Sequence, residues 1–492
     1  MADHSAQIHF VLVPLMSPGH LIPMVDIAKL LARHNVVVSI VSTPLNTPRI
    51  KAAVDFAVES GLKIRLLELE FPAAQAGLPP GCENMDSLPS RDMIKNYFEA
   101  AAMLQEPFER LFQDLKPRPR CIISGKNLAW TVETARKFNV PRLFFDGMGC
   151  FSFACTQSLH SSRIHETVSR FEPFTVPGLA HRIKLTRAQL PEALNPGSED
   201  LIDVRNKIVA AESISDGIIV NTFEELEQDY IQEFKKTKGT RVWCIGPVSA
   251  CNKSETEKIT RGNANANLPT QKHPCLEWLD NQEPKSVVYA CLGSICGLSA
   301  TQLIEVGLGL EASNSPFLWV IRGGEKSKHL EKWIQEEKFE ERTKGRGFII
   351  RGWSPQLLIL SHPSTGAFLT HCGWNSTLEG ICAGKPIITC PLFAEQFINE
   401  RLIVDVLGSG VSVGVKAAVA WGIEEKSGLV ILREDVKNAV ENAMEKSHEA
   451  ERRREKAVEI AEMAKKATAE EGSSYLSIKA LIRDVMQETS SF

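Results

Sequence analysis

Residues 353–396 read WSPQLLILSHPSTGAFLTHCGWNSTLEGICAGKPIITCPLFAEQ, and this stretch contains the pattern that decides the fold. The apolar run Gly366–Thr370 predicts a buried strand, and the turn HCGWNS follows it. Ser376 or Thr377 is expected to open a helix, and Pro386–Pro391 predicts the next strand. Because strand, helix and strand follow one another, the two strands should pair in parallel through a right-handed crossover.

The same alternation runs outward from this stretch toward both ends of the chain. In the second half, further strands are expected at Ser286–Leu292, Phe317–Ile321 and Gly347–Ile350, with a helix at Gln302–Ala312. In the first half, strands are expected at Ile8–Leu15, Val36–Thr43, Cys121–Ser124, Arg142–Phe145 and Gly217–Asn221. Helices are expected up to Arg33 and at Thr131–Phe138. The pattern predicts an α/β protein with two doubly wound parallel sheets.

A polar segment without either period separates the two halves. We interpret residues 249–274 as a linker between an N-terminal domain at 1–248 and a C-terminal domain at 275–492. The tail from Arg433 to Met463 is expected to form a charged helix with a solvated face. The last helix is expected to be able to pack back on the N-terminal domain.

Charge and composition exclude several classes of protein. The 56 Lys and Arg against 60 Asp and Glu give a net charge of −4, whereas nucleic acid and anionic membranes require a basic face. Charged residues at 24% and hydrophobic residues at 43% are typical of a globular chain. No apolar run approaches the ~20 residues that span a bilayer. The short apolar N-terminal run lacks a basic flank, so we expect a strand there rather than a signal peptide.

The twelve cysteines are scattered, without a CxxC pair or a His cluster at zinc spacing. We therefore expect reduced thiols, a cytoplasmic location and no metal site. No Asp-x-Asp occurs in the chain, so the usual acidic clamp for a diphosphate-bound metal is missing. No cofactor is expected, and a monomer is the expected state.

The turn after Gly366–Thr370 carries residue types that suit a nucleotide. A helix N-terminus attracts phosphate, and His371 and Ser376 would add side-chain donors. Glu379 lies one turn into the helix, where its carboxylate could accept from two ribose hydroxyls. Trp353 could stack on a planar base. Together these residues predict a nucleotide-binding site.

This segment resembles the signature segment of plant secondary-product UDP-glycosyltransferases. The resemblance extends over the chain, from PLMSPGHLIPM at residues 14–24 to VAWGIEEKSG at residues 419–428. It is most similar to the branch that acts on triterpenoids, steroids, flavonoids and cytokinins. The resemblance implies a GT-B architecture, in which two Rossmann-like domains face a cleft and the second domain holds most of the nucleotide.

The resemblance also implies roles for residues of this chain. Trp353 would stack on uracil, Gln356 would contact the nucleoside, and Glu379 would bind the ribose. The pyrophosphate would be bound by His371, Asn375 and Ser376, with Ser294 in the CLGS turn on the phosphate side. The sugar would be contacted by Trp374, Glu395 and Gln396. These partners, a UDP-sugar and a small-molecule acceptor, are the ones that we expect.

His20 is the expected general base. It follows the first strand in SPGH, and a neutral His at a strand end can accept a proton from an alcohol. The resemblance gives this His the role of the catalytic base. Relatives pair it with an Asp after the fourth strand, but this chain has Gly125 there.

Asp146 is the candidate that we expect to replace the missing carboxylate. It ends the neighbouring strand in FFDGMG, where relatives commonly have FHG. Adjacent strands lie ~4.8 Å apart, so its side chain could reach His20. The alternative is that Asp146 only caps the following turn, which leaves Lys126 and Asn127 as the nearby polar side chains.

The sequence thus predicts inverting, metal-independent transfer of a sugar, glucose by preference, to a hydroxyl of a small apolar plant metabolite. The acceptor class is expected to be a triterpenoid or steroid, a flavonoid or a similar compound. A UDP-sugar-binding protein with weak catalysis, caused by the loss of a carboxylate at Gly125, is the alternative. A nicotinamide oxidoreductase is disfavoured because the first strand–helix turn lacks paired glycines.

Overall fold

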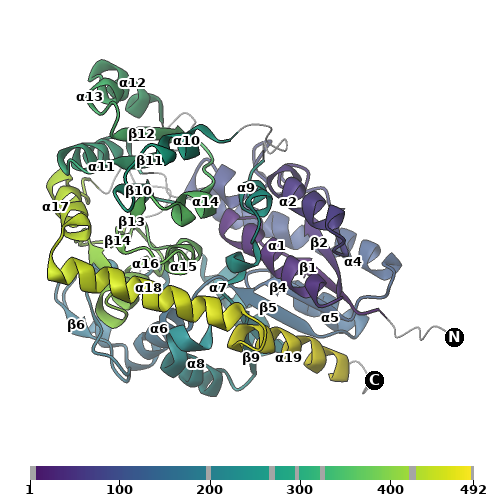
Figure 1. Cartoon of the computed structure of the whole chain (residues 1–492). Helices are drawn as coiled ribbons and strands as arrows, with labels where there is room; N and C mark the ends of the chain where they lie inside the picture. The colour runs from purple at the N-terminus through teal and green to yellow at the C-terminus, as the bar shows by residue number, and fades with distance from the viewer. Residues whose placement is uncertain are drawn as a thin grey trace. The chain divides into compact units, whose positions relative to one another are not determined.

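Two parallel sheets organise this chain, one in each of two units. The computed structural model describes residues 7–194, 201–264, 272–293, 298–321, 327–419 and 428–488. The first unit holds the described parts of Met1–Met148, Ser198–Leu268 and Lys466–Phe492, and the second those of Gly149–Gly197 and Pro269–Lys465. Figure 1 shows the helices that pack around each sheet.

The first sheet has seven parallel strands in the order β3-β2-β1-β4-β5-β8-β9. Their bounds are β1 His9–Val13, β2 Val37–Ser42, β3 Ile64–Glu68, β4 Cys121–Gly125, β5 Arg142–Asp146, β8 Gly217–Val220 and β9 Arg241–Cys244. All residues of β1, β2, β4, β5 and β8 are buried, as expected for a parallel sheet that is covered on both faces.

The helices of the first unit connect these strands. They are α1 Pro18–Arg33, α2 Thr47–Glu59, α3 Ile94–Met103, α4 Gln105–Asp114, α5 Thr131–Phe138, α7 Ile202–Ser213, α8 Glu224–Lys238, α9 Glu255–Thr260 and α19 Ser473–Glu488, with short turns η1 Met85–Ser87, η2 Arg91–Met93 and η7 Val248–Cys251. The last helix, α19, packs on β9, where the Trp243 indole N–H donates to Asp484 at 3.2 Å.

The second sheet has six parallel strands in the order β12-β11-β10-β13-β14-β15. Their bounds are β10 Val287–Cys291, β11 Phe317–Ile321, β12 Gly347–Arg351, β13 Thr365–Thr370, β14 Ile387–Thr389 and β15 Gly410–Ser412. A separate antiparallel pair, β6 Phe174–Thr175 with β7 Lys184–Leu185, also belongs to this unit.

The helices of the second unit include α6 Cys150–Ser162, α10 Pro274–Asp280, α11 Ala300–Ala312, α12 Lys328–Glu336, α13 Phe339–Arg342, α14 Gln356–Ser361, α15 Trp374–Cys382, α16 Gln396–Arg401, α17 Arg433–Met444 and α18 His448–Thr468. Short 3₁₀ turns are η3 Ile164–Glu166, η4 Arg187–Gln189 and η5 Glu192–Leu194, and η9 Leu402–Val406 is a π-helix that continues α16. No helix among the described residues combines the length and the apolar character that crossing a membrane would require.

The α/β prediction is confirmed, and every expected strand is present within a residue or two of its predicted bounds. The sequence missed five strands: β3, β6, β7, β9 and β15. Strands β3 and β9 are edge strands with charged or half-buried residues, and the other three have only two or three residues, so none of them gives an apolar run. The charged tail is two helices rather than one, because Glu445 is extended and the Ser447 hydroxyl accepts from the Ala450 N–H.

The start of the predicted linker is ordered and belongs to the first unit. Residues 249–274 include most of η7 and all of α9, which contact α1 and α2 respectively. Ser254 and Glu257 form a capping box at the start of α9. The sequence SETE at residues 254–257 is a capping-box signal for a helix start. We did not predict the helix because the segment is polar throughout.

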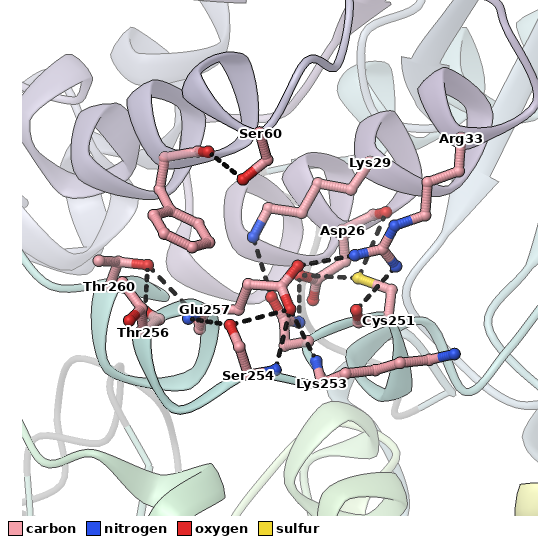
Figure 2. Close-up of polar contacts among 12 residues, drawn as sticks. Asp26, Lys29, Arg33, Ser60, Cys251, Lys253, Ser254, Thr256, Glu257 and Thr260 are labelled. Atoms are coloured by element: carbon pink, nitrogen blue, oxygen red, sulfur yellow. Dashed lines mark hydrogen bonds and ion pairs between the residues drawn. The ribbon is translucent and has the colours of Figure 1, made fainter.

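The buried charges of Asp26 and Lys29, with the exposed Arg33, hold this segment on α1, as Figure 2 shows. Lys29 Nζ donates to Asn252 Oδ1 at 2.9 Å, and the Asn252 amide donates to Asp26 Oδ1 at 2.8 Å. Arg261 Nε donates to Asp26 Oδ2 at 2.8 Å. Since Asp26 and Lys29 are both fully enclosed, this polar chain makes the segment part of the first unit's interior.

Removing the Asp26 carboxylate should therefore destabilise the first unit. Asp26→Ala leaves the nearly buried Arg261 without its anion, and we expect a loss of about 3 kcal/mol in the free energy of unfolding. Urea unfolding of the full chain, followed by tryptophan fluorescence, measures this loss. The matched control is Asp55→Ala in the exposed Lys51–Asp55 pair, where we expect less than about 0.5 kcal/mol. Equal losses in the two variants would contradict this account.

Candidate active site

The strand order reverses once in each sheet, and the candidate site residues lie at these two points. In the first sheet the reversal is between β1 and β4. His20 follows β1, and Gly125 is the last residue of β4. In the second sheet the reversal is between β10 and β13, which Gly293 and His371 follow within a few residues. Ligands of open α/β sheets bind beyond the carboxyl ends of the strands at such points.

The His371 ring occupies a space that is open only because two neighbouring residues are glycines. A Cβ on Gly293 would lie 2.5 Å from its Nε2 atom, and a Cβ on Gly373 would lie 2.4 Å from the same atom. Gly293 also has a φ of +86°, a conformation that favours glycine. Burial lowers the pKa of His371 to about 4, so the ring is neutral at pH 7. The sequence analysis missed both glycines, although each comes directly after a strand or its turn.

The turn from His371 to Gly373 is fixed by side chains from two helices. Cys372 has a left-handed φ of 64°, which is strained for a residue with a side chain. Asn399 of α16 donates to the Cys372 carbonyl at 2.8 Å, and Ser152 of α6 donates to the Asn399 oxygen at 2.8 Å. Asn399 and Ser152 are thus positioning residues that no sequence pattern indicated.

The side chains of Gln356, Ser376 and Glu379 lie together. Gln356 Nε2 donates to Glu379 Oε2 at 2.7 Å and to Ser376 Oγ at 3.4 Å. The Tyr289 hydroxyl of β10 donates to Gln356 Oε1 at 3.1 Å. The cluster presents a carboxylate, an amide and hydroxyls, which are the groups that bind a ribose or a phosphate.

Trp353 lies half-buried between β12 and α14, and its ring meets His273 edge-on with centroids 6.4 Å apart. Gly352 before it has a φ of +96°, so the chain turns sharply at the end of β12. Trp353 is thereby placed three residues before Gln356, on the same side of the sheet's carboxyl edge.

Helix α15 begins at Trp374, two residues earlier than expected. Gly373 is extended and caps the helix, so Trp374, Asn375 and Ser376 form its first turn. Backbone N–H groups of a first turn attract anions. The earlier start adds Trp374 and Asn375 to the helix end that was predicted to hold phosphate.

The end of the segment has a structural task as well. Gln396 Oε1 accepts from the N–H groups of Leu392 and Phe393 at 2.9 and 3.1 Å, and this closes the loop before α16. Glu395 is the N-cap residue of α16. The last predicted donor residue, Ser294, lies outside the described residues.

In the first unit, His20 is the third residue of α1, and its ring is half-buried. Its Nδ1 atom is enclosed and has no hydrogen-bond partner among the described residues. The ring meets Phe145 edge-on, with centroids 6.4 Å apart. Burial, with the Lys126 ammonium adding to it, lowers the pKa of His20 to about 4. The imidazole is therefore neutral at pH 7 and able to accept a proton.

The expectation that Asp146 pairs with His20 is wrong for the direct contact. Asp146 Oδ2 lies 2.5 Å from Lys126 Nζ, and Asp146 Oδ1 accepts from the Met148 N–H at 3.3 Å. The physical reason is that an ammonium on the adjacent strand attracts a buried carboxylate more strongly than a neutral imidazole does. The alternative prediction, that Asp146 caps the following turn, accounts for its contact with the Met148 N–H. It did not include the ion pair with Lys126.

Gly125 leaves the carboxyl end of β4 without a side chain. Its Cβ would lie 3.1 Å from the Leu15 nitrogen, a tight approach, and its φ is not left-handed. The buried Arg142 guanidinium donates to the carbonyls of Gly125 and Lys126 at 3.4 Å each. No cluster of three or more His, Cys, Asp or Glu in the described ranges could hold a metal ion.

Comparison with known proteins gives this arrangement a family. Residues 6–250 match the family described as glycosyltransferase, N-terminal domain, and residues 260–461 match the family described as UDP-glucoronosyl and UDP-glucosyl transferase. UDP-glycosyltransferase 73C6 of Arabidopsis thaliana is 49% identical over 98% of this chain and 97% of its own length. The chain belongs to the plant secondary-product UDP-glycosyltransferase family.

Other relatives and solved structures agree. UDP-glycosyltransferase 73C25 of Barbarea vulgaris is 48% identical over 98% of this chain and 97% of its own length. UGT73P12 of Glycyrrhiza uralensis, solved with glycyrrhetinic acid 3-O-monoglucuronide, superposes with a TM-score of 0.90 at 34% identity, over 98% of this chain and 96% of that one. UGT2 of Phytolacca americana, solved with UDP-2fluoro-glucose and pterostilbene, is 26% identical with a TM-score of 0.73, over 97% and 100% of the two chains. This plant UDP-glycosyltransferase therefore has the GT-B fold of two Rossmann-like domains.

The glycines around the His371 ring lead to a direct prediction for this glycosyltransferase. Gly373 has φ and ψ angles that alanine tolerates, so Gly373→Ala acts mainly by pushing on the His371 ring. We expect UDP affinity, measured by calorimetry, to fall at least tenfold. Gly147→Ala is the control, because its Cβ would meet His20 at an ordinary 3.6 Å in the other unit. Wild-type affinity in Gly373→Ala would show that the ring position does not matter.

The lowered pKa of His20 predicts an unusual pH profile. A base with a pKa of about 4 stays neutral in acid, so kcat/KM should not decline between about pH 7.5 and about pH 5.5. Lys126 and Asp146 are the charged groups beside the ring. Lys126→Met removes the cation and leaves the carboxylate, so it should move the acid limb to higher pH. A wild-type acid limb near the ordinary His value of about 6.5 would contradict this assignment.

Proposed function

We propose that this enzyme transfers glucose from UDP-glucose to a hydroxyl of a small apolar plant metabolite, with His20 as general base. The observation that carries the proposal is the neutral His20 ring at the carboxyl end of β1. His20 takes the hydroxyl proton, and the oxygen attacks the anomeric carbon on the face opposite UDP, which inverts the configuration.

The donor is held by the segment from Trp353 to Gln396. Trp353 stacks on uracil, while Gln356 and Glu379 take the nucleoside and its ribose. The pyrophosphate lies at the start of α15, where it meets His371, Asn375 and Ser376; Ser294, which is outside the described residues, keeps its predicted phosphate-side role. The sugar contacts Trp374, Glu395 and Gln396. Support comes from the Gln356–Glu379 hydrogen bond, which places an amide and a carboxylate beside that helix end.

The leaving UDP needs no metal in this proposal. Its growing charge is stabilised by fixed donors and by the dipole of α15. Activity should therefore survive EDTA, and a strict requirement for Mg²⁺ or Mn²⁺ would overturn this part.

The acceptor is an apolar compound, such as a triterpenoid or steroid, a flavonoid or a similar metabolite. Apolar side chains surround the chain between β1 and α1, where Leu15 and Met16 line a small cavity with Phe71, Tyr97 and Trp130. The Glycyrrhiza neighbour was solved with a glucuronide and the Phytolacca neighbour with pterostilbene, which supports acceptors with and without a sugar.

A second candidate is a UDP-sugar-binding protein with weak catalysis. The observation that favours it is the absence of a hydrogen-bond partner for His20 Nδ1 within the described chain, with a cation as a neighbour. UDP binding is common to both candidates, so turnover separates them. The test is a panel of acceptors with UDP-glucose, followed by mass spectrometry of the products, and no product from any acceptor would favour the second candidate.

Donor choice is tested on the first acceptor that gives a product. UDP-glucose should have a higher kcat/KM than UDP-galactose or UDP-glucuronic acid, since Trp374 with Gln396 resembles the glucose-using pattern. The reverse order would remove glucose from the proposal.

Replacing the base should affect chemistry and spare donor binding. His20→Ala is expected to lower kcat by at least about 100-fold, because a positioned base typically supplies a factor of 10² to 10⁴. UDP affinity should stay near that of the wild type, since the UDP residues lie in the other unit. His329→Ala on the exposed face of α12 is the control and should leave both quantities unchanged. A near-normal kcat in His20→Ala would remove it from the mechanism.

A further inference from the structure

The environment of His20 limits the kind of hydroxyl that it can deprotonate. A catalytic imidazole gains strength as a base when a carboxylate holds its Nδ1–H and stabilises the imidazolium that forms. In this enzyme Nδ1 is enclosed and has no hydrogen-bond partner among the described residues. Among the described residues, no side chain therefore stabilises the protonated ring from that side.

The Lys126 ammonium opposes protonation of the ring. Lys126 brings an ammonium to the end of β4, and Asp146, the nearby carboxylate, is engaged by that ammonium at 2.5 Å. Its second oxygen accepts from the Met148 N–H. Because this carboxylate is paired with Lys126, the imidazolium would form beside an ion pair and without a carboxylate of its own. The lowered pKa of His20 agrees with this geometry.

Such a base suits acidic hydroxyls and fails with ordinary alcohols. A phenol has a pKa of about 10, whereas an aliphatic alcohol is nearly as weak an acid as water, with a pKa of about 15.7. The two differ by roughly six orders of magnitude in the ease of losing the proton. A phenol can lose its proton before its oxygen attacks, because the phenolate anion is stable, so it needs less help from the base.

We infer that the sugar acceptor of this enzyme is a phenolic hydroxyl rather than an aliphatic one. The inference rests on the proposed function and narrows its acceptor class. The phenol transfers its proton to His20 Nε2 or to solvent, its oxygen forms the bond to the anomeric carbon, and the bond from that carbon to UDP breaks. The products are a phenyl glucoside, UDP and one proton.

The structure also shows where the missing carboxylate could be restored. Strands β1 and β4 pair with Val13 opposite Ser124, so Gly125 lies beside Leu15. From Leu15 the chain turns directly into α1 and His20, through the hydrogen bonds from Ser17 N–H to the Leu15 carbonyl and from His20 N–H to the Ser17 carbonyl. A side chain at position 125 needs a shift of a few tenths of an ångström at Leu15 and no left-handed backbone.

The test uses two isomeric tetrahydronaphthols, one with its hydroxyl on the aromatic ring and one with it on the saturated ring. The isomers have the same formula and nearly the same shape, so they differ mainly in acidity. With UDP-glucose and the wild-type enzyme, we expect kcat/KM to be at least about 100-fold higher for the phenolic isomer. Similar values for the two isomers would overturn the inference and leave the proposed glucosyl transfer intact. No glucoside from either isomer, or from the wider acceptor panel, would count against the proposed function itself.

Variants at position 125 test the cause. Gly125→Asp should raise kcat/KM for the aliphatic isomer at least tenfold and for the phenolic isomer less than threefold. Gly125→Asn has the same shape without the charge and should leave the ratio of the two isomers at its wild-type value. Thermal melting and UDP affinity establish that both variants are folded. A folded Gly125→Asp enzyme with an unchanged isomer ratio would contradict the proposed cause.

Discussion

In a parallel sheet every strand ends at the same edge, and the crossover helices must all return to the opposite edge. This constraint gathers the functional residues of the chain at two places, the ends of β1 and β4 and the ends of β10 and β13. His20, Gly125 and Lys126 meet at the first place although more than a hundred residues separate them. Gly293 and His371 meet at the second for the same reason.

The donor site depends on the space that glycines leave. His371 is enclosed by positions where any Cβ would collide with its ring, and the turn that carries it contains a strained Cys372. Asn399 and Ser152 hold that turn from outside the conspicuous segment. Asn399 and Ser152 thus fix the positions of the His371 ring, the turn at Cys372 and the start of α15 relative to one another.

The base site follows a different electrostatic logic from a carboxylate–imidazole pair. Here the carboxylate of Asp146 lies on a neighbouring strand and is bound to a cation, while the imidazole stands without an anionic partner. The resemblance led us to expect Asp at position 125 and His at position 146, and the Gly125 and Asp146 found there are thus not an exchange of one dyad for another. They leave the His20 imidazole neutral and without an anionic partner, and the inferred preference for acidic acceptors rests on that.

The sequence by itself determined the parallel α/β fold, because apolar strand runs alternating with helical periods permit few other arrangements. It also indicated a nucleotide site at the turn after β13, where Ser376 and Glu379 follow near the start of a helix; the family resemblance added Gln356. Only the tertiary structure decided the partner of Asp146. A carboxylate at a strand end has several neighbours within reach, and it pairs with the nearest cation, here Lys126. It likewise decided that Gly293 and Gly373 leave room for the His371 ring. It also decided that Asn252 bridges Asp26 and Lys29 by hydrogen bonds. Those contacts join residues distant in the chain through space, and no local period or spacing encodes them.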